Sequence, residues 1–157
     1  MKSSLNFPIL SGWTRRRVTV LAALAVLSGL AGCSNADEAE GKSVSLETAR
    51  AAIDAGQVQV FDIREPQEHA GGVARGAHLL PMSQLGARLG EIPRDPAQPV
   101  LLICQTQNRS SKAAAALRER GYTNVRYVHG GMAGWAGKGW PMVAPSASPG
   151  TTPGATR

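Results

Sequence analysis

The apolar run at residues 100–103, Val-Leu-Leu-Ile, constrains the fold more than any other stretch of the chain. A short uninterrupted apolar run bounded by turn-forming residues is typical of a strand buried on both faces of a parallel sheet. Cys104 follows at once, then a polar stretch, and then an alanine-rich segment at 110–120 that predicts a helix. In α/β proteins, ligands bind beyond the carboxyl ends of such strands. The chain is therefore expected to adopt an α/β fold with a thiol at that edge of the sheet.

Segments typical of strands and of helices alternate along residues 43–143. Hydrophobic periodicity and turn residues predict an edge strand near Val44, strands at 58–63, 77–80, 100–103 and 124–128, and helices at 46–55 (capped by Ser45), 84–89, 110–120 and 130–137. Alternation of this kind favours a parallel sheet covered by helices. A segment of about 100 residues suffices for one hydrophobic core, so a single domain is expected.

The N-terminal segment has the composition of a secretory signal peptide. Three consecutive arginines precede the apolar residues 18–30, a run shorter than the roughly 20 residues that a membrane-spanning helix needs. The Leu-Ala-Gly-Cys sequence that ends at Cys33 resembles the lipobox of bacterial lipoproteins, in which the cysteine becomes the lipidated first residue of the mature protein. We therefore expect a signal peptide at 1–32 and lipidation of Cys33. Ordinary secretion with a free Cys33 is the alternative.

The resemblance to a lipoprotein implies a domain in the bacterial cell envelope, attached to a membrane through Cys33 and facing the periplasm. Ser34, rather than an aspartate, follows the lipidated position, which favours the outer membrane. The three arginines also fit twin-arginine export, so the export route stays open. The polar residues 33–42 are expected to form a tether, and the Pro-, Ser- and Thr-rich residues 144–157 a disordered tail.

The net charge of +6 at first suggests an affinity for nucleic acid. Four of the basic residues precede Cys33, so the processed chain would carry only about +2, and its remaining basic residues are scattered. Nucleic-acid binding is therefore not expected. The three histidines show no metal-ligand spacing, and neither a metal site nor another cofactor is expected.

Three sequence blocks carry the motifs of one known family. They are Asp-Ile-Arg-Glu-Pro-Gln-Glu-His at 62–69, followed by glycines 72 and 76; Cys-Gln-Thr-Gln-Asn-Arg-Ser at 104–110; and Gly-Gly-Met-Ala-Gly-Trp at 130–135. In this order and spacing they resemble the single-domain rhodaneses, sulfurtransferases that carry sulfur as a cysteine persulfide. The resemblance implies a rhodanese-like three-layer α/β sandwich around a five-stranded parallel sheet at residues 43–143. We expect this domain to be a monomer.

The resemblance also implies that Cys104 is the catalytic residue. It would take sulfur from thiosulfate or another sulfane donor and pass it, as a persulfide, to a thiol or to cyanide. Donor binding is assigned to the loop after Cys104 and to one earlier arginine: Gln105, Thr106, Gln107, Asn108, Arg109, Ser110 and Arg64. Loop N–H groups, the start of the following helix and Arg109 would supply positive potential for the anion. Arg109 could instead pair with a carboxylate, for which Asp62, a residue of structural support, is the candidate.

Two other interpretations stay open. The first is a phosphatase or a reductase on a related scaffold. Those enzymes have five residues between the cysteine and the arginine, whereas this chain has four, which favours sulfur chemistry. Gln107 stands where the family often has glycine, and its side chain is expected to restrict the backbone angles that let the loop N–H groups converge. If turnover is impaired in this way, the domain would be a non-catalytic binding or regulatory module tethered to the membrane.

Overall fold

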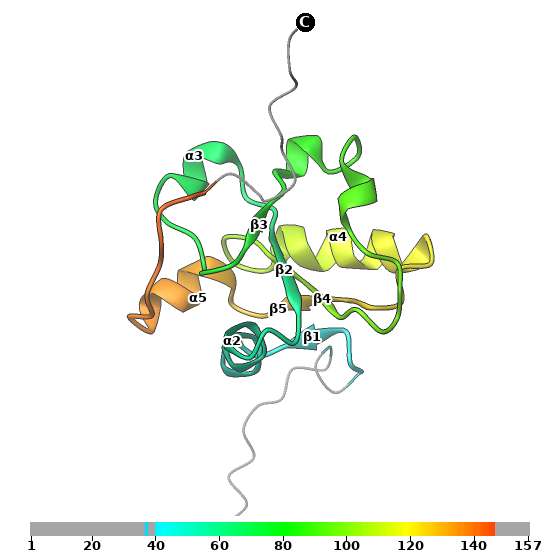
Figure 1. The fold of residues 1–157 in the computed structure, drawn as a ribbon, viewed down its shortest axis with the longest axis horizontal. Helices are drawn as coiled ribbons and strands as arrows, with labels where there is room; N and C mark the ends of the chain where they lie inside the picture. Colours follow the sequence, from blue (N-terminus) through cyan, green and yellow to red (C-terminus); the bar gives the residue numbers. More distant parts are fainter. Residues whose placement is uncertain (1–36, 38–39, 147–157) are drawn as a thin grey trace, which may run out of the picture. The chain divides into compact units, whose positions relative to one another are not determined.

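Five parallel strands form one sheet in the order β1-β5-β4-β2-β3 (Figure 1). The computed structural model describes residue 37 and residues 40–146. The strands are β1 (Ser43–Val44), β2 (Gln59–Asp62), β3 (His78–Leu79), β4 (Val100–Ile103) and β5 (Val125–Val128). The parallel sheet expected from the alternating pattern is confirmed, and Val44 belongs to an edge strand as predicted.

The central strand β4 sends its side chains to both faces of the sheet. Alternate residues pack in one apolar cluster with α4 (Asn108–Glu119), and the others pack in a second cluster with α2 (Leu46–Asp54) and α5 (Gly131–Gly137). All four β4 residues are at most 2% exposed. Helices therefore cover both faces of the sheet, and the three-layer sandwich is confirmed (Figure 1).

Local sequence signals account for the helix starts. Ser45 caps α2, since its hydroxyl oxygen accepts a hydrogen bond from Thr48 N at 3.2 Å. The helix α4 begins at Asn108, two residues before the start predicted from the sequence. Arg109 and Ser110 consequently belong to the first turn of a helix, which holds their backbone more firmly than a loop would.

Two segments differ from the predicted secondary structure. Two 3-10 turns, Met82–Gln84 and Leu89–Glu91, occupy the region of the helix predicted at 84–89. Gly86 and Gly90 interrupt this region between Pro81 and Pro93, so it holds too few consecutive helix-forming residues for a stable α-helix. Conversely, the short helix α3 (Pro66–His69) replaces part of the polar loop expected after β2. Its first residue is a proline, which favours a helix start.

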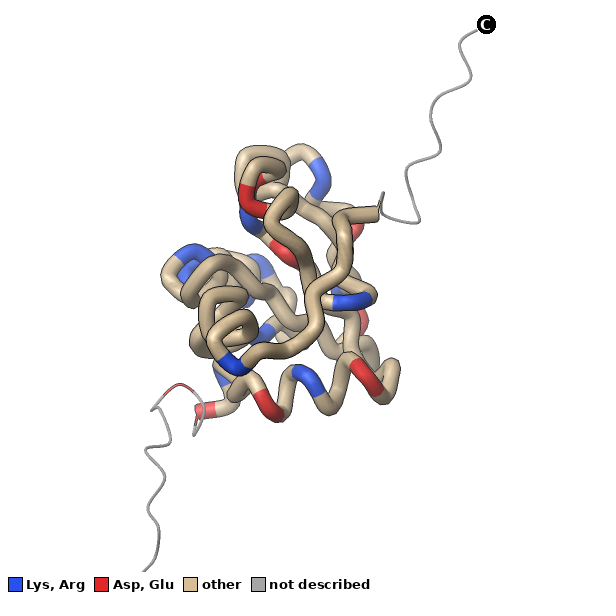
Figure 2. Tube along the Cα trace, turned by 90° about the vertical axis from the view of Figure 1, so that its left-hand side faces the viewer, with Lys and Arg blue, Asp and Glu red and all other residues tan. Residues whose placement is uncertain are grey.

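Charged residues of both signs are interspersed along the domain (Figure 2). Because no long stretch of one sign dominates this view, the electrostatic potential at any site depends mainly on the charges next to it.

Within residues 40–146, no helix has the length and apolar character required to cross a membrane. The predicted signal peptide, Cys33 and most of the tether at 33–42 lie outside the described residues, as does the tail from residue 147 onward. The boundaries 43–143 for the folded domain stay a prediction.

Candidate active site

Cys104 lies directly after β4, at the carboxyl end of the central strand. The residue is free, and it packs in the apolar cluster on the α4 side of the sheet. The predicted placement of a thiol at this edge is therefore confirmed. Cys104 is only 1% exposed, so its sulfur is shielded from solvent in this conformation.

Ser110 is the polar neighbour of the thiol. Its main-chain N–H donates to Cys104 Sγ at 3.4 Å, and the thiol donates to Ser110 Oγ at 3.4 Å. Ser110 is itself buried, in the first turn of α4, where the helix dipole favours negative charge. The main-chain N–H contact can stabilise a sulfur anion at a position that solvent barely reaches.

The N-terminal end of α5 contacts the loop that follows Cys104. Met132 N donates to Cys104 O at 2.9 Å, and Ala133 N donates to Gln105 O at 2.8 Å. At Gly131, with φ 56°, a Cβ atom would lie 2.4 Å from Cys104 O and 2.3 Å from Thr106 O, so only glycine fits this approach. The glycine-rich block at 130–135 therefore positions the active loop, a role that the sequence alone did not indicate.

Arg109 forms a bidentate ion pair with Glu68 of α3. Its Nη1 donates to Oε2 at 2.7 Å and its Nη2 donates to Oε1 at 2.6 Å. These hydrogen bonds lower the pKa of Glu68 to about 2 and raise the pKa of Arg109. The sequence-based choice of Asp62 as the carboxylate partner of Arg109 is wrong, because Asp62 is bound by Arg64.

Asp62 and Arg64 form a buried ion pair at the end of β2. Arg64 Nε donates to Asp62 Oδ1 at 3.0 Å, and Arg64 Nη2 donates to Asp62 Oδ2 at 2.6 Å. Arg64 also donates to two main-chain oxygens, from Nη2 to Gly72 O at 2.8 Å and from Nη1 to Glu68 O at 3.2 Å. The guanidinium thus links β2 to the segment at 68–72. Direct binding of a sulfur donor by Arg64 stays a prediction.

The two ion pairs meet at Glu68. Its main-chain oxygen accepts a hydrogen bond from Arg64, and its carboxylate accepts two from Arg109. Its Oε2 also accepts a hydrogen bond from Glu65 N at 2.9 Å, which closes the first turn of α3. Sequence reasoning missed Glu68 as a site residue. The spacing of Glu65, Pro66 and Glu68 is a helix-start signal that could have indicated it.

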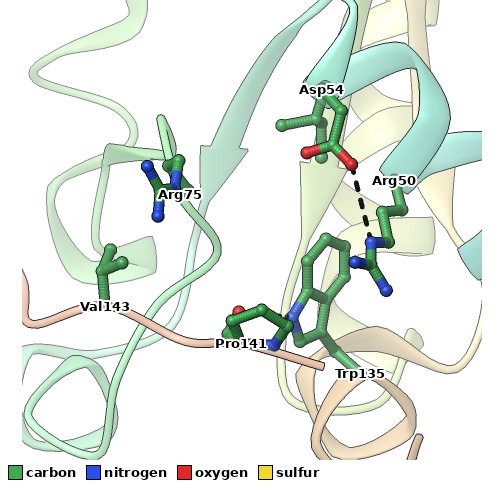
Figure 3. Close-up of a pocket in the computed structure, with 7 residues that line it drawn as sticks. Arg50, Asp54, Arg75, Trp135, Pro141 and Val143 are labelled. Carbon is green, nitrogen blue, oxygen red and sulfur yellow. Dashed lines mark hydrogen bonds and ion pairs between the residues drawn. The ribbon is translucent and has the colours of Figure 1, made fainter. Parts of the chain in front are cut away.

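Two cavities differ in their relation to the loop. One of about 350 Å³ is lined by residues that include Arg64, Glu68, Gln105 and Met132, so it adjoins the active loop. Another of about 40 Å³ lies beside α2 and Trp135 and contains no residue of the loop (Figure 3). Only the first of these two is placed to admit a substrate to the loop.

Among the residues described, no three His, Cys, Asp or Glu side chains are grouped so that they could hold a metal ion.

Sequence comparisons identify relatives of this arrangement. The profile of the Rhodanese-like domain family matches residues 45–138. A protein of Allochromatium vinosum named Sulfurtransferase is 38% identical over 109 residues, which cover 69% of this chain and 96% of that protein. The uncharacterized protein YqhL of Bacillus subtilis is 44% identical over 82 residues, which cover 52% of this chain and 64% of that protein. The present chain therefore spans slightly less than two thirds of YqhL.

Solved structures share the fold. A rhodanese-related protein from Thermoplasma volcanium has a TM-score of 0.58 and 29% identity, with coverage of 66% of this chain and 99% of its own. The human single-domain sulfurtransferase TSTD1 has a TM-score of 0.55 and 28% identity, with coverage of 62% and 96%. The family match at 45–138 includes Cys104 and both ion pairs, and the chain accordingly belongs to the rhodanese-like domain family.

Proposed function

We propose that the protein is a sulfurtransferase that carries sulfane sulfur as a persulfide on Cys104. The observation that carries this proposal is the position of Cys104 Sγ, 3.4 Å from Ser110 N in the first turn of α4. An N–H donor and a helix N-terminus suit a sulfur nucleophile that becomes a persulfide anion. The relative named Sulfurtransferase and the similarity to human TSTD1 support the same class of chemistry.

In the first half-reaction, the Cys104 thiolate attacks the outer sulfur of thiosulfate. A bond forms between Sγ and that sulfur, the S–S bond of thiosulfate breaks, and its electron pair leaves with sulfite. A thiolate and a dianion thus become a persulfide anion and a sulfite dianion, so the step needs no outside oxidant. Ser110 N is placed to stabilise the negative charge on Sγ before the attack.

In the second half-reaction, a thiolate acceptor or cyanide attacks the outer sulfur of the persulfide. A bond forms between the acceptor and that sulfur, and the bond to Sγ breaks with its electron pair returning to Cys104. The acceptor leaves as a persulfide or as thiocyanate, and the Cys104 thiolate is regenerated.

Arg109 supplies positive potential beside the loop, and Glu68 holds its guanidinium in place. Because the carboxylate offsets part of this charge, a donor experiences a weaker attraction than a free guanidinium would exert. Asp62 and Arg64 support the site through the main chain of Glu68. Arg64 also lines the cavity beside the loop, and direct binding of the donor by Arg64 is part of the proposal.

Intact mass spectrometry of the reduced protein, before and after thiosulfate, tests the proposal. One transferred sulfur adds about 32 Da, and cyanide or a thiol should remove it. The Cys104→Ser variant should gain no mass under the same conditions. An organic persulfide serves as a second donor if thiosulfate gives no product. If neither donor loads Cys104, the enzymatic proposal is wrong.

The burial of Cys104 favours one alternative, a non-catalytic rhodanese-like binding or regulatory module. A residue that is 1% exposed offers a donor very little surface in this conformation. Cellular function that persists in a Cys104→Ser strain would support the module. Loss of that function together with loss of sulfur transfer would support the enzyme.

We also propose that the domain faces the periplasm of a bacterial cell and is anchored by lipid on Cys33. The Leu-Ala-Gly-Cys sequence at 30–33 supports this location. Cell fractionation should recover the wild type with membranes, in the outer membrane if Ser34 acts as expected, and the Cys33→Ala variant in the soluble fraction. Recovery of both proteins with membranes would contradict anchoring through Cys33.

A further inference from the structure

Gln107 ends the active loop and occupies the N-cap position of α4. Its backbone has φ −169° and ψ −11°. This φ is not positive, so the position does not require glycine. The sequence predicted that the Gln107 side chain would restrict the backbone of the loop. The φ angle shows no such restriction, so the presence of glutamine rather than glycine here needs another explanation.

The Gln107 side chain reaches across to the start of α5. Its Oε1 accepts a hydrogen bond from Gly130 N at 2.9 Å, although the two residues are 23 positions apart. Gly130 is the N-cap of α5, with φ 80°. The first N–H groups of a helix lack acceptors within the helix, so an acceptor from outside is needed. A glycine at position 107 would have no side chain to make this contact.

This hydrogen bond is the third link between the start of α5 and the active loop. The other two, from Met132 N to Cys104 O and from Ala133 N to Gln105 O, use main-chain oxygens that every sequence possesses. Those two links hold the beginning of the loop. The link from Gln107 holds its end, next to the helix that carries Ser110.

The end of the loop is connected to the thiol through Ser110. Ser110 Oγ donates to Gln107 O at 3.2 Å, while the Cys104 thiol donates to Ser110 Oγ at 3.4 Å. A serine hydroxyl has a single proton. Once Cys104 is a thiolate, Gln107 O and Cys104 Sγ compete for that proton. The position of residue 107 therefore influences how well Ser110 can stabilise the sulfur anion.

We propose that Gln107 is a positioning residue: its amide oxygen holds the end of the active loop against Gly130, and this contact sets the reactivity of Cys104. The expected effect of this contact on turnover rests on the proposed sulfur transfer. Held in this way, residues 107–110 present Ser110 to Cys104 Sγ in a fixed geometry, which lowers the cost of organising the loop when the donor arrives.

The Gln107→Met variant tests the contact, because methionine has a similar length and no amide oxygen. Loss of a hydrogen bond of ordinary net strength corresponds to about a fivefold change in an equilibrium constant. We therefore expect the Gly130 amide hydrogen to exchange about fivefold faster, measured by NMR in the folded protein. We also expect Cys104 to load sulfur from saturating thiosulfate, and to react with iodoacetamide, about fivefold more slowly.

Two further variants separate positioning from a general loss of stability. Gln107→Glu keeps an acceptor oxygen, so Gly130 exchange should stay slow. Its added negative charge should raise KM for thiosulfate. Gln57→Met is the matched control, an exposed glutamine in the turn before β2, and should change neither exchange nor loading.

The outcomes distinguish this inference from the proposed function. If Gln107→Met matches the wild type in Gly130 exchange and in both reaction rates, the positioning role is wrong even though sulfur transfer stands. If the wild type loads no sulfur at all, the proposed function fails. In that case faster Gly130 exchange and slower alkylation in Gln107→Met would still support the positioning role, and unchanged values would overturn it.

Discussion

Two arginine–carboxylate pairs are connected through Glu68, and their side chains differ in exposure to solvent. The side chains of Asp62 and Arg64 are 0% and 5% exposed, whereas those of Glu68 and Arg109 are 30% and 35% exposed. Water cannot replace a lost partner in the first pair, but it can in the second. We infer that the buried pair supports the fold, while the half-exposed pair adjusts the charge beside Cys104.

The largest effect is expected when the buried pair is broken. Asp62→Asn removes the carboxylate charge and leaves the Arg64 guanidinium buried without a counter-ion. An uncompensated buried charge of this kind costs about 3–5 kcal/mol. Urea unfolding should therefore show a large decrease in the free energy of unfolding.

Asp54→Asn is the matched control for that variant. Asp54 pairs with Arg50 at 3.6 Å on α2, and its side chain is 63% exposed. Its replacement should change the free energy of unfolding by less than about 0.5 kcal/mol. A similar small change for Asp62→Asn would show that burial does not distinguish the two ion pairs.

A smaller effect on stability is expected at the half-exposed pair. Glu68→Gln removes the charge that offsets Arg109 and should cost only ~0.2–1 kcal/mol, because solvent screens the pair. The positive charge beside the loop would no longer be offset. We therefore expect KM for dianionic thiosulfate to fall about twofold to fivefold in steady-state assays.

Glu91→Gln provides the comparison for this effect on KM. Glu91 also accepts two hydrogen bonds from an arginine, Arg88, but this pair lies in the 82–91 segment. Its loss should cost a similar amount of stability and leave KM unchanged. Equal KM values for the two variants would contradict the role that we assign to the pair beside Cys104.

The pH dependence of unfolding offers the smallest expected effect. Hydrogen bonds from Arg109 lower the pKa of Glu68 from 4.5 to about 2 in the folded protein. A carboxyl group with a depressed folded pKa stabilises the protein above its unfolded pKa and loses this contribution as the pH falls through the folded value. The wild type should therefore lose more stability than Glu68→Gln as the pH falls from 4.5 to about 2. Parallel curves for the two proteins in urea unfolding would contradict this linkage.

The sequence predicted the sheet better than the segments around it. The run at 100–103 became β4 with the predicted bounds, because a continuous apolar run leaves few alternatives to a buried strand. The predicted helix at 84–89 is wrong, since glycines divide that region and its apolar residues pack from short turns instead. The helix α3 was missed because four residues are too few to show a helical period.

Among the candidate site residues, local pattern alone located Cys104 at the end of β4 and Ser110 near the start of the next helix. It could not identify the partners that reach them from elsewhere. Arg109 pairs with Glu68 from 41 positions away, and Gln107 contacts Gly130 from 23 positions away. The order of strands and helices follows from the spacing of apolar and turn residues, which act over a few neighbours. Those distant pairings depend on how α3 and α5 pack against the end of the sheet, and the burial of the thiol depends on the apolar cluster on the α4 side. No short stretch of sequence encodes that packing.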